Sequence, residues 1–257
     1  MVRKFLAALV CILITAWAVP SDGFMLLGRR LGFLGNDGYT KLLLHFDGTD
    51  ASTAINDTAR SGHVMTAAAN AQLDTAQKKF GSASLLLDGT GDQITCPIDA
   101  DFNFGAGNFT IDFWVRFNSV AASQYFFAIK PEAGDVITCD WDQALTRLSF
   151  TATVGGVTKA NYYSIFEPTA GPWYHIAIVR NATSLLVFLN GISQLPTEST
   201  AISTNDIGAH DGGATDLFYI GSASSTLYIN GWMDEFRVSK GIARWTVNFT
   251  PSTQEYR

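Results

Sequence analysis

The sequence predicts an all-β fold in which two antiparallel sheets pack as a sandwich. Short apolar or alternating stretches recur from Lys41 onward. Turn residues separate these stretches, and the chain is rich in Gly (23) and poor in Pro (7). No helical period lies between the stretches. Strands at this even spacing, joined by turns, are typical of a β-sandwich.

The expected strands follow one another along the chain. The clearest is 109–117, where every second residue is apolar and Thr110, Asp112 and Arg116 alternate with them, with Trp114 as an exception on the polar side. The other expected strands are 42–46, 83–87, 93–97, 124–130, 147–154, 160–166, 173–180, 184–190, 217–220 and 227–238.

Two Asn-Gly pairs predict tight hairpin turns, one at Asn190-Gly191 and one at Asn230-Gly231. After the second pair, strict alternation puts Asp234 on the same side as Phe236, which should face the core. A lone carboxylate there is costly unless it is hydrogen-bonded, paired or metal-bound. The role of Asp234 is therefore the sharpest chemical question that the sequence raises.

The first 40 residues differ from the rest. Residues 1–18 have a basic start, an apolar run and a small-x-small end at Ala16-Trp17-Ala18, which predicts an export signal; the alternative is an uncleaved apolar segment. The run is too short for a stable membrane span. Gly-rich residues 19–40 are interpreted as a linker or arm, and 41–257 as the folded domain.

Charge and cysteine content narrow the function classes. A net charge of -6 with 16% charged residues argues against nucleic-acid binding, which needs clustered Lys and Arg. Cys96 and Cys139 lie in the predicted domain and form either one disulfide, in an exported chain, or two buried thiols. No Cys/His cluster is present in the sequence, so no zinc site is expected.

Six short motifs occur in a characteristic order. They are LLLHFDG at 42–48, KFGSAS at 79–84, LDGTGD at 87–92, FTIDFWV at 109–115, WYHIA at 173–177 and GWMDEFRVSKG at 231–241. Together they resemble the laminin-G-like, concanavalin A-like jelly-roll family over about 41–257. The resemblance implies a two-sheet jelly roll whose members mostly bind glycans or proteins, while some are enzymes.

The resemblance also implies a structural calcium near the rim of the sandwich. It places Asp234 in that site, with Asp47 and Asp57 as companions and Asp88 as a further ligand, because calcium prefers several oxygen ligands. The alternative for Asp234 is a carboxylate that accepts backbone N–H groups. Asp47 and Asp88 each precede a Gly, which is also typical of an ordinary turn.

Glycan binding would use exposed aromatic rings with polar side chains beside them. The candidates are Trp114 with Asp112 and Arg116, then Trp141 between Asp140 and Asp142, and after them Tyr162-Tyr163. The alternative is that these rings are buried in the core. The Gly- and Asp-rich loop 204–215 is either a ligand loop or a solvated connection.

The expected strands lack the paired carboxylates of a retaining glycosidase, so no enzymatic activity is expected. The first hypothesis is a non-catalytic module, secreted or surface-displayed, that binds glycans. The alternative is a structural or assembly protein of the phage tail or virion decoration type, which contacts other proteins or further copies of itself. A glycoside hydrolase is a distant third.

Overall fold

The computed structural model describes residues 36–130, 134–208, 216–223 and 226–257. The predicted signal at 1–18, most of the predicted arm at 19–40 and most of the loop 204–215 therefore lie outside the described residues. Within them, the only helical element is a short 3-10 helix, η1 (Ala100–Phe102), and all other regular elements are strands. No helix in this part of the chain is long and apolar enough to cross a membrane.

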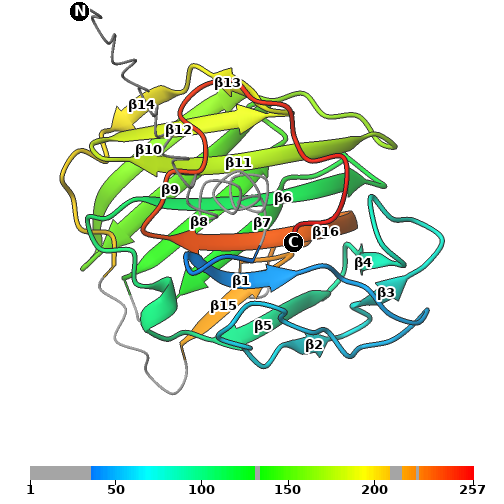
Figure 1. Cartoon of the computed structure of the whole chain (residues 1–257). Helices are drawn as coiled ribbons and strands as arrows, with labels where there is room; N and C mark the ends of the chain where they lie inside the picture. Colours follow the sequence, from blue (N-terminus) through cyan, green and yellow to red (C-terminus); the bar gives the residue numbers. More distant parts are fainter. Residues whose placement is uncertain (1–35, 131–133, 209–215, 224–225) are drawn as a thin grey trace, which may run out of the picture. The chain divides into compact units, whose positions relative to one another are not determined.

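The strands form two antiparallel sheets that face each other (Figure 1). The first sheet contains β1 Thr40–Leu44, β3 Gln72–Asp74, β4 Ser84–Asp88, β6 Phe109–Phe117, β11 Trp173–Asn181, β12 Ser184–Leu189, β13 Ile192–Gln194 and β16 Asn230–Lys240. Its order is β13-β12-β11-β6-β16-β4-β3, and β1 also pairs with β16.

The second sheet contains β2 Thr66–Ala68, β5 Gln93–Pro97, β7 Gln124–Lys130, β8 Val136–Asp142, β9 Arg147–Val154, β10 Val157–Ile165, β14 Thr197–Thr200 and β15 Leu217–Ile220. Its order is β14-β10-β9-β8-β7-β15-β5-β2. The predicted all-β, two-sheet antiparallel sandwich is confirmed.

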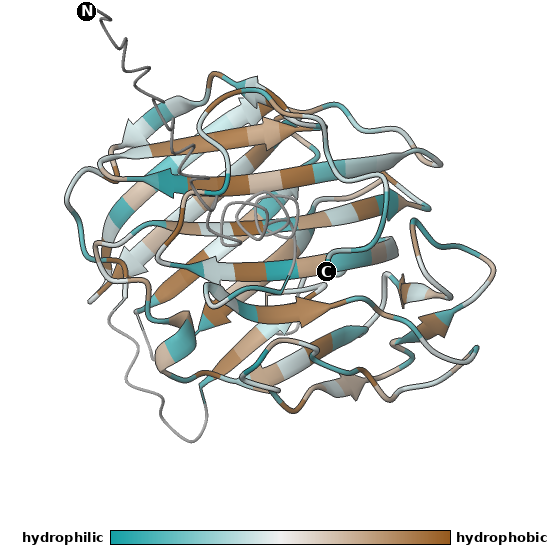
Figure 2. Ribbon diagram, viewed as in Figure 1, coloured by the Kyte–Doolittle hydropathy of each residue, from teal (hydrophilic) through white to brown (hydrophobic). Residues whose placement is uncertain are grey.

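Aromatic side chains from the inner faces of both sheets fill the core. Phe113 of β6 stacks on Phe236 of β16, with ring centroids 5.4 Å apart, and contacts Phe126 of β7 across the sandwich at 5.2 Å. All three are fully buried. Burial of each such ring contributes about 1.5–3 kcal/mol, and Figure 2 shows the apolar residues alternating with polar ones along the central strands.

Strong alternation gave accurate strand bounds, while β8 and the short strands β2, β3, β13 and β14 were not among the expected strands. The predicted bounds of β5, β6, β7, β9 and β15 agree with the structure. Strand β8 was not predicted because Asp140 and Asp142, which point outward on it, are residues that strands usually avoid.

The two Asn-Gly pairs have different roles. Asn190 and Gly191, with φ of 50° and 77°, make the predicted turn between β12 and β13. The turn predicted at Asn230-Gly231 is wrong, since both residues begin β16. Gly231 is required there because a Cβ atom would lie 2.1 Å from the carbonyl oxygen of Arg116 on β6.

A bulge changes the alternation along β16. The pairing of β16 with β6 shifts between Asp234 and Arg237, and Glu235 has a φ of 50°. Met233 and Phe236 therefore both face the core. The predicted placement of Asp234 on the same side as Phe236 is wrong, because the extra residue of the bulge resets the side-chain pattern.

The C-terminal segment 241–257 covers the outer face of the first sheet (red in Figure 1). Trp245 and Phe249 stack with centroids 4.0 Å apart, and both meet the edge of His175 on β11. Tyr256, near the end of the chain, is only 3% exposed. This sheet is consequently buried on both faces around β6 and β11.

The two cysteines of the described residues, Cys96 on β5 and Cys139 on β8, are free and buried. Burial raises the pKa of the Cys96 thiol to about 12. Of the two alternatives that the sequence left open, the structure shows buried thiols.

Candidate functional site

Two of the four aspartates predicted to bind calcium hold the same loop. Asp234 is buried and accepts backbone N–H bonds from Lys79 (2.7 Å) and Phe80 (3.1 Å). Asp47 accepts bonds from the backbone N–H and the hydroxyl of Ser82. Burial raises the pKa of Asp234 well above its ordinary value, although the N–H groups oppose this. Both carboxylates thus fix loop 79–82 through hydrogen bonds.

The other two aspartates also accept hydrogen bonds from nearby groups. Asp57 accepts N–H bonds from Leu43 and Ala59, each at 2.9 Å. Asp88 caps its own turn by accepting from the N–H of Thr90 at 2.8 Å. In the described residues no three of these four aspartates converge on one point. Calcium binding by them stays a prediction.

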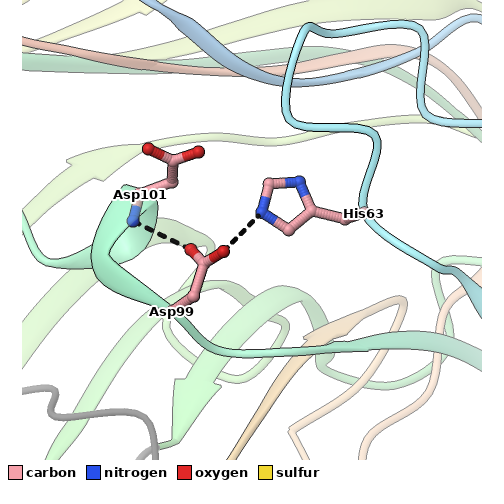
Figure 3. Close-up of side chains that lie close together, drawn as sticks. All are labelled: His63, Asp99 and Asp101. Atoms are coloured by element: carbon pink, nitrogen blue, oxygen red, sulfur yellow. Dashed lines mark hydrogen bonds and ion pairs between the residues drawn. The ribbon is translucent and has the colours of Figure 1, made fainter.

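A different group of side chains does converge. His63, Asp99 and Asp101 bring one ligand atom each to within 4.8 Å of one another (Figure 3). None of the three was singled out from the sequence, because they lie on two separate loops.

The residues predicted to contact a glycan are mostly covered. Asp112 is fully buried, and Trp114 is 6% exposed, with Lys79 Nζ 4.0 Å from the centre of its ring. Trp141 points inward, is 3% exposed, and donates its Nε1–H to the carbonyl oxygen of Phe166. Arg116 is half-buried over the ring of Trp232. The expectation of an exposed polar side on β6 is wrong, because sequence alternation did not reveal the covering segment.

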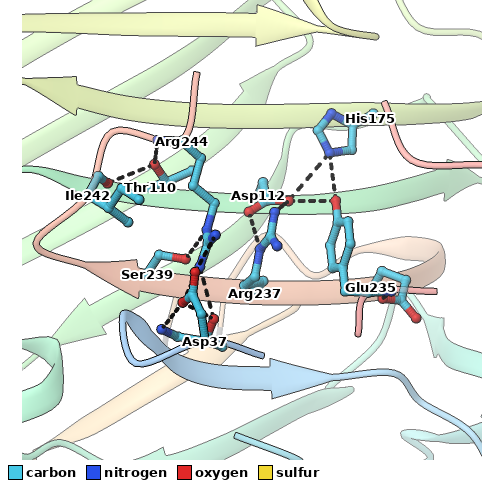
Figure 4. A network of polar contacts seen from close by, with 11 residues as sticks. Asp37, Thr110, Asp112, His175, Glu235, Arg237, Ser239, Ile242 and Arg244 are labelled. Atoms are coloured by element: carbon cyan, nitrogen blue, oxygen red, sulfur yellow. Dashed lines mark hydrogen bonds and ion pairs between the residues drawn. The ribbon is translucent and has the colours of Figure 1, made fainter. Parts of the chain in front are cut away.

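Asp112 belongs to a buried ionic network (Figure 4). Arg237 contacts both of its carboxylate oxygens at 2.9 Å, and the hydroxyl of Tyr256 donates to it at 2.6 Å. Burial alone would raise the pKa of Asp112, but the charge of Arg237 and the nearby His175 hold it well below its ordinary value. The Arg237 guanidinium also lies 3.8 Å from the centre of the Tyr256 ring. Asp112 therefore anchors the C-terminal segment to the first sheet.

A second pair in Figure 4 secures the start of the domain. Arg244 Nη2 lies 2.9 Å from Asp37 Oδ1, and Arg244 Nε donates to Ser239 Oγ at 2.7 Å. The backbone N–H of Asn36 donates to the carbonyl oxygen of Arg257. The last residues of the predicted arm, 36–40, are thus bonded to the domain.

The outer face of the second sheet remains open and carries a groove of about 620 Å³. Strands β7, β8 and β9 and the loops beside them supply its lining. These residues are Tyr125, Lys130, Gly134, Asp135, Val136, Thr138, Asp140, Thr151, Thr153, Gly156, Ala223 and Thr226. Hydroxyl, carboxylate and phenol groups dominate the side chains, so the groove suits a polar ligand.

Strand register aligns four of the outward residues across this face. Tyr125 of β7 is paired with Asp140 of β8, Asp140 with Ser149 of β9, and Ser149 with Tyr163 of β10. We call this set the Tyr125–Tyr163 row. Because neighbouring strands are about 4.8 Å apart, the row spans roughly 14 Å, the length of a short oligosaccharide.

The centre of the row has unused hydrogen-bonding capacity. Within the described residues Asp140 makes no hydrogen bond, and the hydroxyl of Ser149 is buried without a partner. Burial, reinforced by the charge of Asp142, raises the pKa of Asp140 to about 7. The Asp140 carboxylate is the group that a ligand would meet first, because the unpaired Ser149 hydroxyl has no exposed surface.

Beyond Tyr163 the surface becomes apolar. A smaller hollow of about 330 Å³ is lined by residues that include Arg147, Tyr163, Ile165 and Leu195. Leu195 is 95% exposed and Ile165 is 77% exposed. The Arg147 guanidinium lies 4.9 Å from the centre of the Tyr163 ring, so one end of the row combines an aromatic ring with a cation.

Two residues of this row were expected from the sequence to lie near a ligand: Tyr163, as part of Tyr162-Tyr163, and Asp140, as a neighbour of Trp141. Tyr162 itself is buried, and its hydroxyl accepts from the backbone N–H of Ile202. The alternation of buried and outward residues over 136–142 is the signal that could have placed Asp140 on a sheet face.

The protein family that matches this sequence agrees with the observed architecture. The family model described as the concanavalin A-like lectin/glucanases superfamily matches residues 88–243, more than half of the chain. The chain belongs to this superfamily. The resemblance seen in the sequence motifs is confirmed, and the two-sheet structure agrees with the jelly roll of the superfamily. No curated protein sequence matches the chain.

Solved structures of the same fold include carbohydrate-binding proteins. One is domain 4 of AbnA, a GH43 extracellular arabinanase from Geobacillus stearothermophilus, in complex with arabinotriose. Its TM-score is 0.57 at 16% identity, over 79% of this chain and 93% of that one. Another is the binding domain of botulinum neurotoxin DC in complex with SialylT, with a TM-score of 0.57 at 15% identity.

A third structure concerns botulinum neurotoxin type C, whose cell entry depends on interaction with two ganglioside molecules; its TM-score is 0.55 at 15% identity. The match covers 79–80% of this chain but only 48–49% of the two toxin chains, so this chain spans about half of their length. At such identities the likeness shows the fold.

Proposed function

We propose that this domain is a non-catalytic recognition module that binds a short oligosaccharide along the Tyr125–Tyr163 row. The observation that carries the proposal is the arrangement of the row, with aromatic rings at both ends and the unsatisfied groups of Asp140 and Ser149 between them. Aromatic rings pack against the C–H face of a sugar, while carboxylate and hydroxyl groups bind its hydroxyls.

The solved structures support this proposal at the level of the fold. AbnA domain 4 was determined with arabinotriose, and a toxin binding domain with SialylT. A protein that recognises such ligands works where glycans are displayed. Together with the signal pattern at 1–18, this supports a secreted or surface-displayed protein.

A glycan array tests the proposal directly. The full chain is applied to arrays of plant and bacterial polysaccharide fragments and of ganglioside headgroups, with calcium and with EGTA. We expect binding to a restricted set of oligosaccharides that is unchanged by EGTA, because the row contains no predicted calcium ligand. Absence of binding to every glycan under both conditions contradicts the proposal.

Replacement of Asp140 by asparagine should remove a pH dependence of binding. The ionised carboxylate is the stronger hydrogen-bond acceptor, and the pKa of Asp140 is about 7. Wild-type affinity should therefore rise severalfold from about pH 6 to about pH 8, whereas the Asp140→Asn variant should show a flat profile. Isothermal titration with an array hit measures both, and equal slopes for the two proteins would exclude a role for this carboxylate.

Glycoside hydrolysis is a second candidate, favoured by one observation. Asp140 and Asp142 point to the same face of β8, and the pKa of Asp140 is raised to about 7, as in a general acid. Release of reducing sugar from a polysaccharide panel, lost in Asp140→Asn, would replace the recognition proposal. We expect no release.

Protein–protein assembly, as in a virion or tail component, is the remaining alternative. The exposed Leu195 and Ile165 favour it, because contiguous apolar surface often marks a protein contact. Sedimentation of the full chain distinguishes the two. A monomer that binds glycans supports recognition, whereas an oligomer that dissociates in Leu195→Ser and binds no glycan supports assembly.

A further inference from the structure

His63 directs its Nε2 toward two carboxylates. Its Nδ1 lies 2.9 Å from Asp57 Oδ2, and the backbone N–H of His63 donates to the same oxygen. A carboxylate only accepts, so Nδ1 carries a hydrogen, and Nε2 offers its lone pair to a metal once it has no hydrogen of its own. The side chain is only 6% exposed, and Nε2 is buried with no hydrogen-bond partner.

The two carboxylates are held in position from a separate part of the chain. Asp99 caps η1, where its Oδ1 accepts the N–H of Asp101 at 2.8 Å, and this leaves Oδ2 at 3.3 Å from His63 Nε2 (Figure 3). Asp101 accepts from the hydroxyl of Ser61 and lies 3.3 Å from Lys41 Nζ. One imidazole nitrogen and two carboxylates thus converge between the loop that follows β1 and the one that follows β5.

We propose that His63, Asp99 and Asp101 bind a divalent transition-metal ion of the Zn²⁺ class. Three nitrogen and oxygen ligands with an open fourth position are typical of zinc sites that keep a water or an external ligand. An imidazole ligand favours such ions over calcium, which prefers oxygen alone. A carboxylate that orients the ligating histidine, as Asp57 does, is the usual second layer of such a site.

This site differs from both sites expected from the sequence. None of its three ligands is among the four aspartates predicted to bind calcium, although one of those, Asp57, orients His63. No zinc site was expected because no Cys/His cluster occurs in the sequence. It is also separate from the Tyr125–Tyr163 row, so the result of its test does not depend on glycan recognition. Lys41 provides the countercharge to Asp101 when no metal is bound, and its ammonium group must move away from Asp101 when a metal binds.

The first test measures metal affinity of the full chain by isothermal titration after removal of metals with EDTA. We expect a single Zn²⁺ site, weaker Mn²⁺ binding and no Ca²⁺ binding at the same place. At a zinc concentration about 100 times the dissociation constant, the melting temperature should rise by roughly 5–10 °C.

Two variants with opposite effects make the test specific. Asp99→Asn keeps the cap on η1 but loses an anionic ligand. It should weaken zinc binding at least tenfold, because even the loss of a residue that only orients a metal ligand has an effect of this order. Lys41→Gln removes the competing cation beside Asp101 and should tighten binding. Glu167→Gln removes an exposed carboxylate elsewhere and should change nothing.

The proposal is overturned if zinc neither binds nor raises the melting temperature of the wild-type chain. Zinc affinity that is the same in Asp99→Asn, Lys41→Gln and wild type would assign the binding to other surface groups and overturn it as well. His63→Gln serves as an additional variant, provided that its circular dichroism matches the wild type. Tightening by Lys41→Gln cannot result from unfolding, so it supports the site directly.

Discussion

Substitution of Asp112 by asparagine is expected to lower the free energy of unfolding by about 3–5 kcal/mol, because it leaves the charge of Arg237 buried without its partner. Both side chains are fully buried, and Asp112 also accepts the hydroxyl of Tyr256. The C-terminal segment should detach more easily as a result. Urea denaturation followed by tryptophan fluorescence, to which Trp245 in that segment contributes, measures the loss.

The matched control is Asp142→Asn, which breaks a partly exposed pair with Arg147 at 3.6 Å. Such surface pairs contribute at most about 1 kcal/mol. The pKa of Asp112 is lowered on folding, so the stabilisation is present above its ordinary value of 3.8 and is lost as the pH falls through the folded value. The acid limb of the stability profile should therefore flatten in Asp112→Asn. Losses of equal size in the two variants would show that the buried network is not the anchor.

The second large effect concerns binding. Each of Tyr125→Ala and Tyr163→Ala should weaken the affinity for an oligosaccharide selected on the array by about 1–2 kcal/mol, and the double variant should show no measurable binding. The two rings lie at opposite ends of the row, so each substitution removes one contact with the sugar chain. Isothermal titration at constant pH gives the three affinities.

Tyr39→Ala is the control for this experiment, since Tyr39 is 45% exposed and lies before β1 in the first sheet. Its affinity should equal that of the wild type. Unchanged affinity in the double variant would show that the row does not bind the glycan, even if the chain binds sugars elsewhere.

Much of the fold could be predicted because one face of most strands is apolar. Alternation located β6 and β7 to the residue, and Asn190-Gly191 gave a hairpin turn from local conformation alone. The same rule failed at β16, where the bulge at Glu235 inserts a residue that no hydrophobic period reveals. It also missed β8, whose outward aspartates resemble turn residues.

The site was harder to predict for two physical reasons. Alternation separates the two faces of a strand but does not show which face another segment covers. Asp112 and Trp114 were therefore predicted to lie on an exposed surface, whereas both are buried. In addition, the side chains that could contact a ligand come from separate parts of the sequence and become neighbours only in the folded chain. Tyr125 and Ser149 become neighbours of Asp140 only when β7, β8 and β9 pair, and His63 meets Asp99 only when two loops fold together.

The most direct test of the account is a map of the residues that respond to a bound glycan. Amide chemical shifts of the full chain are recorded during titration with an array hit. We predict that the largest changes occur along β7 to β10, centred on Tyr125, Asp140 and Tyr163, while Trp114 and the C-terminal segment remain unaffected. Changes centred on the first sheet, or no response to any glycan, would contradict the account.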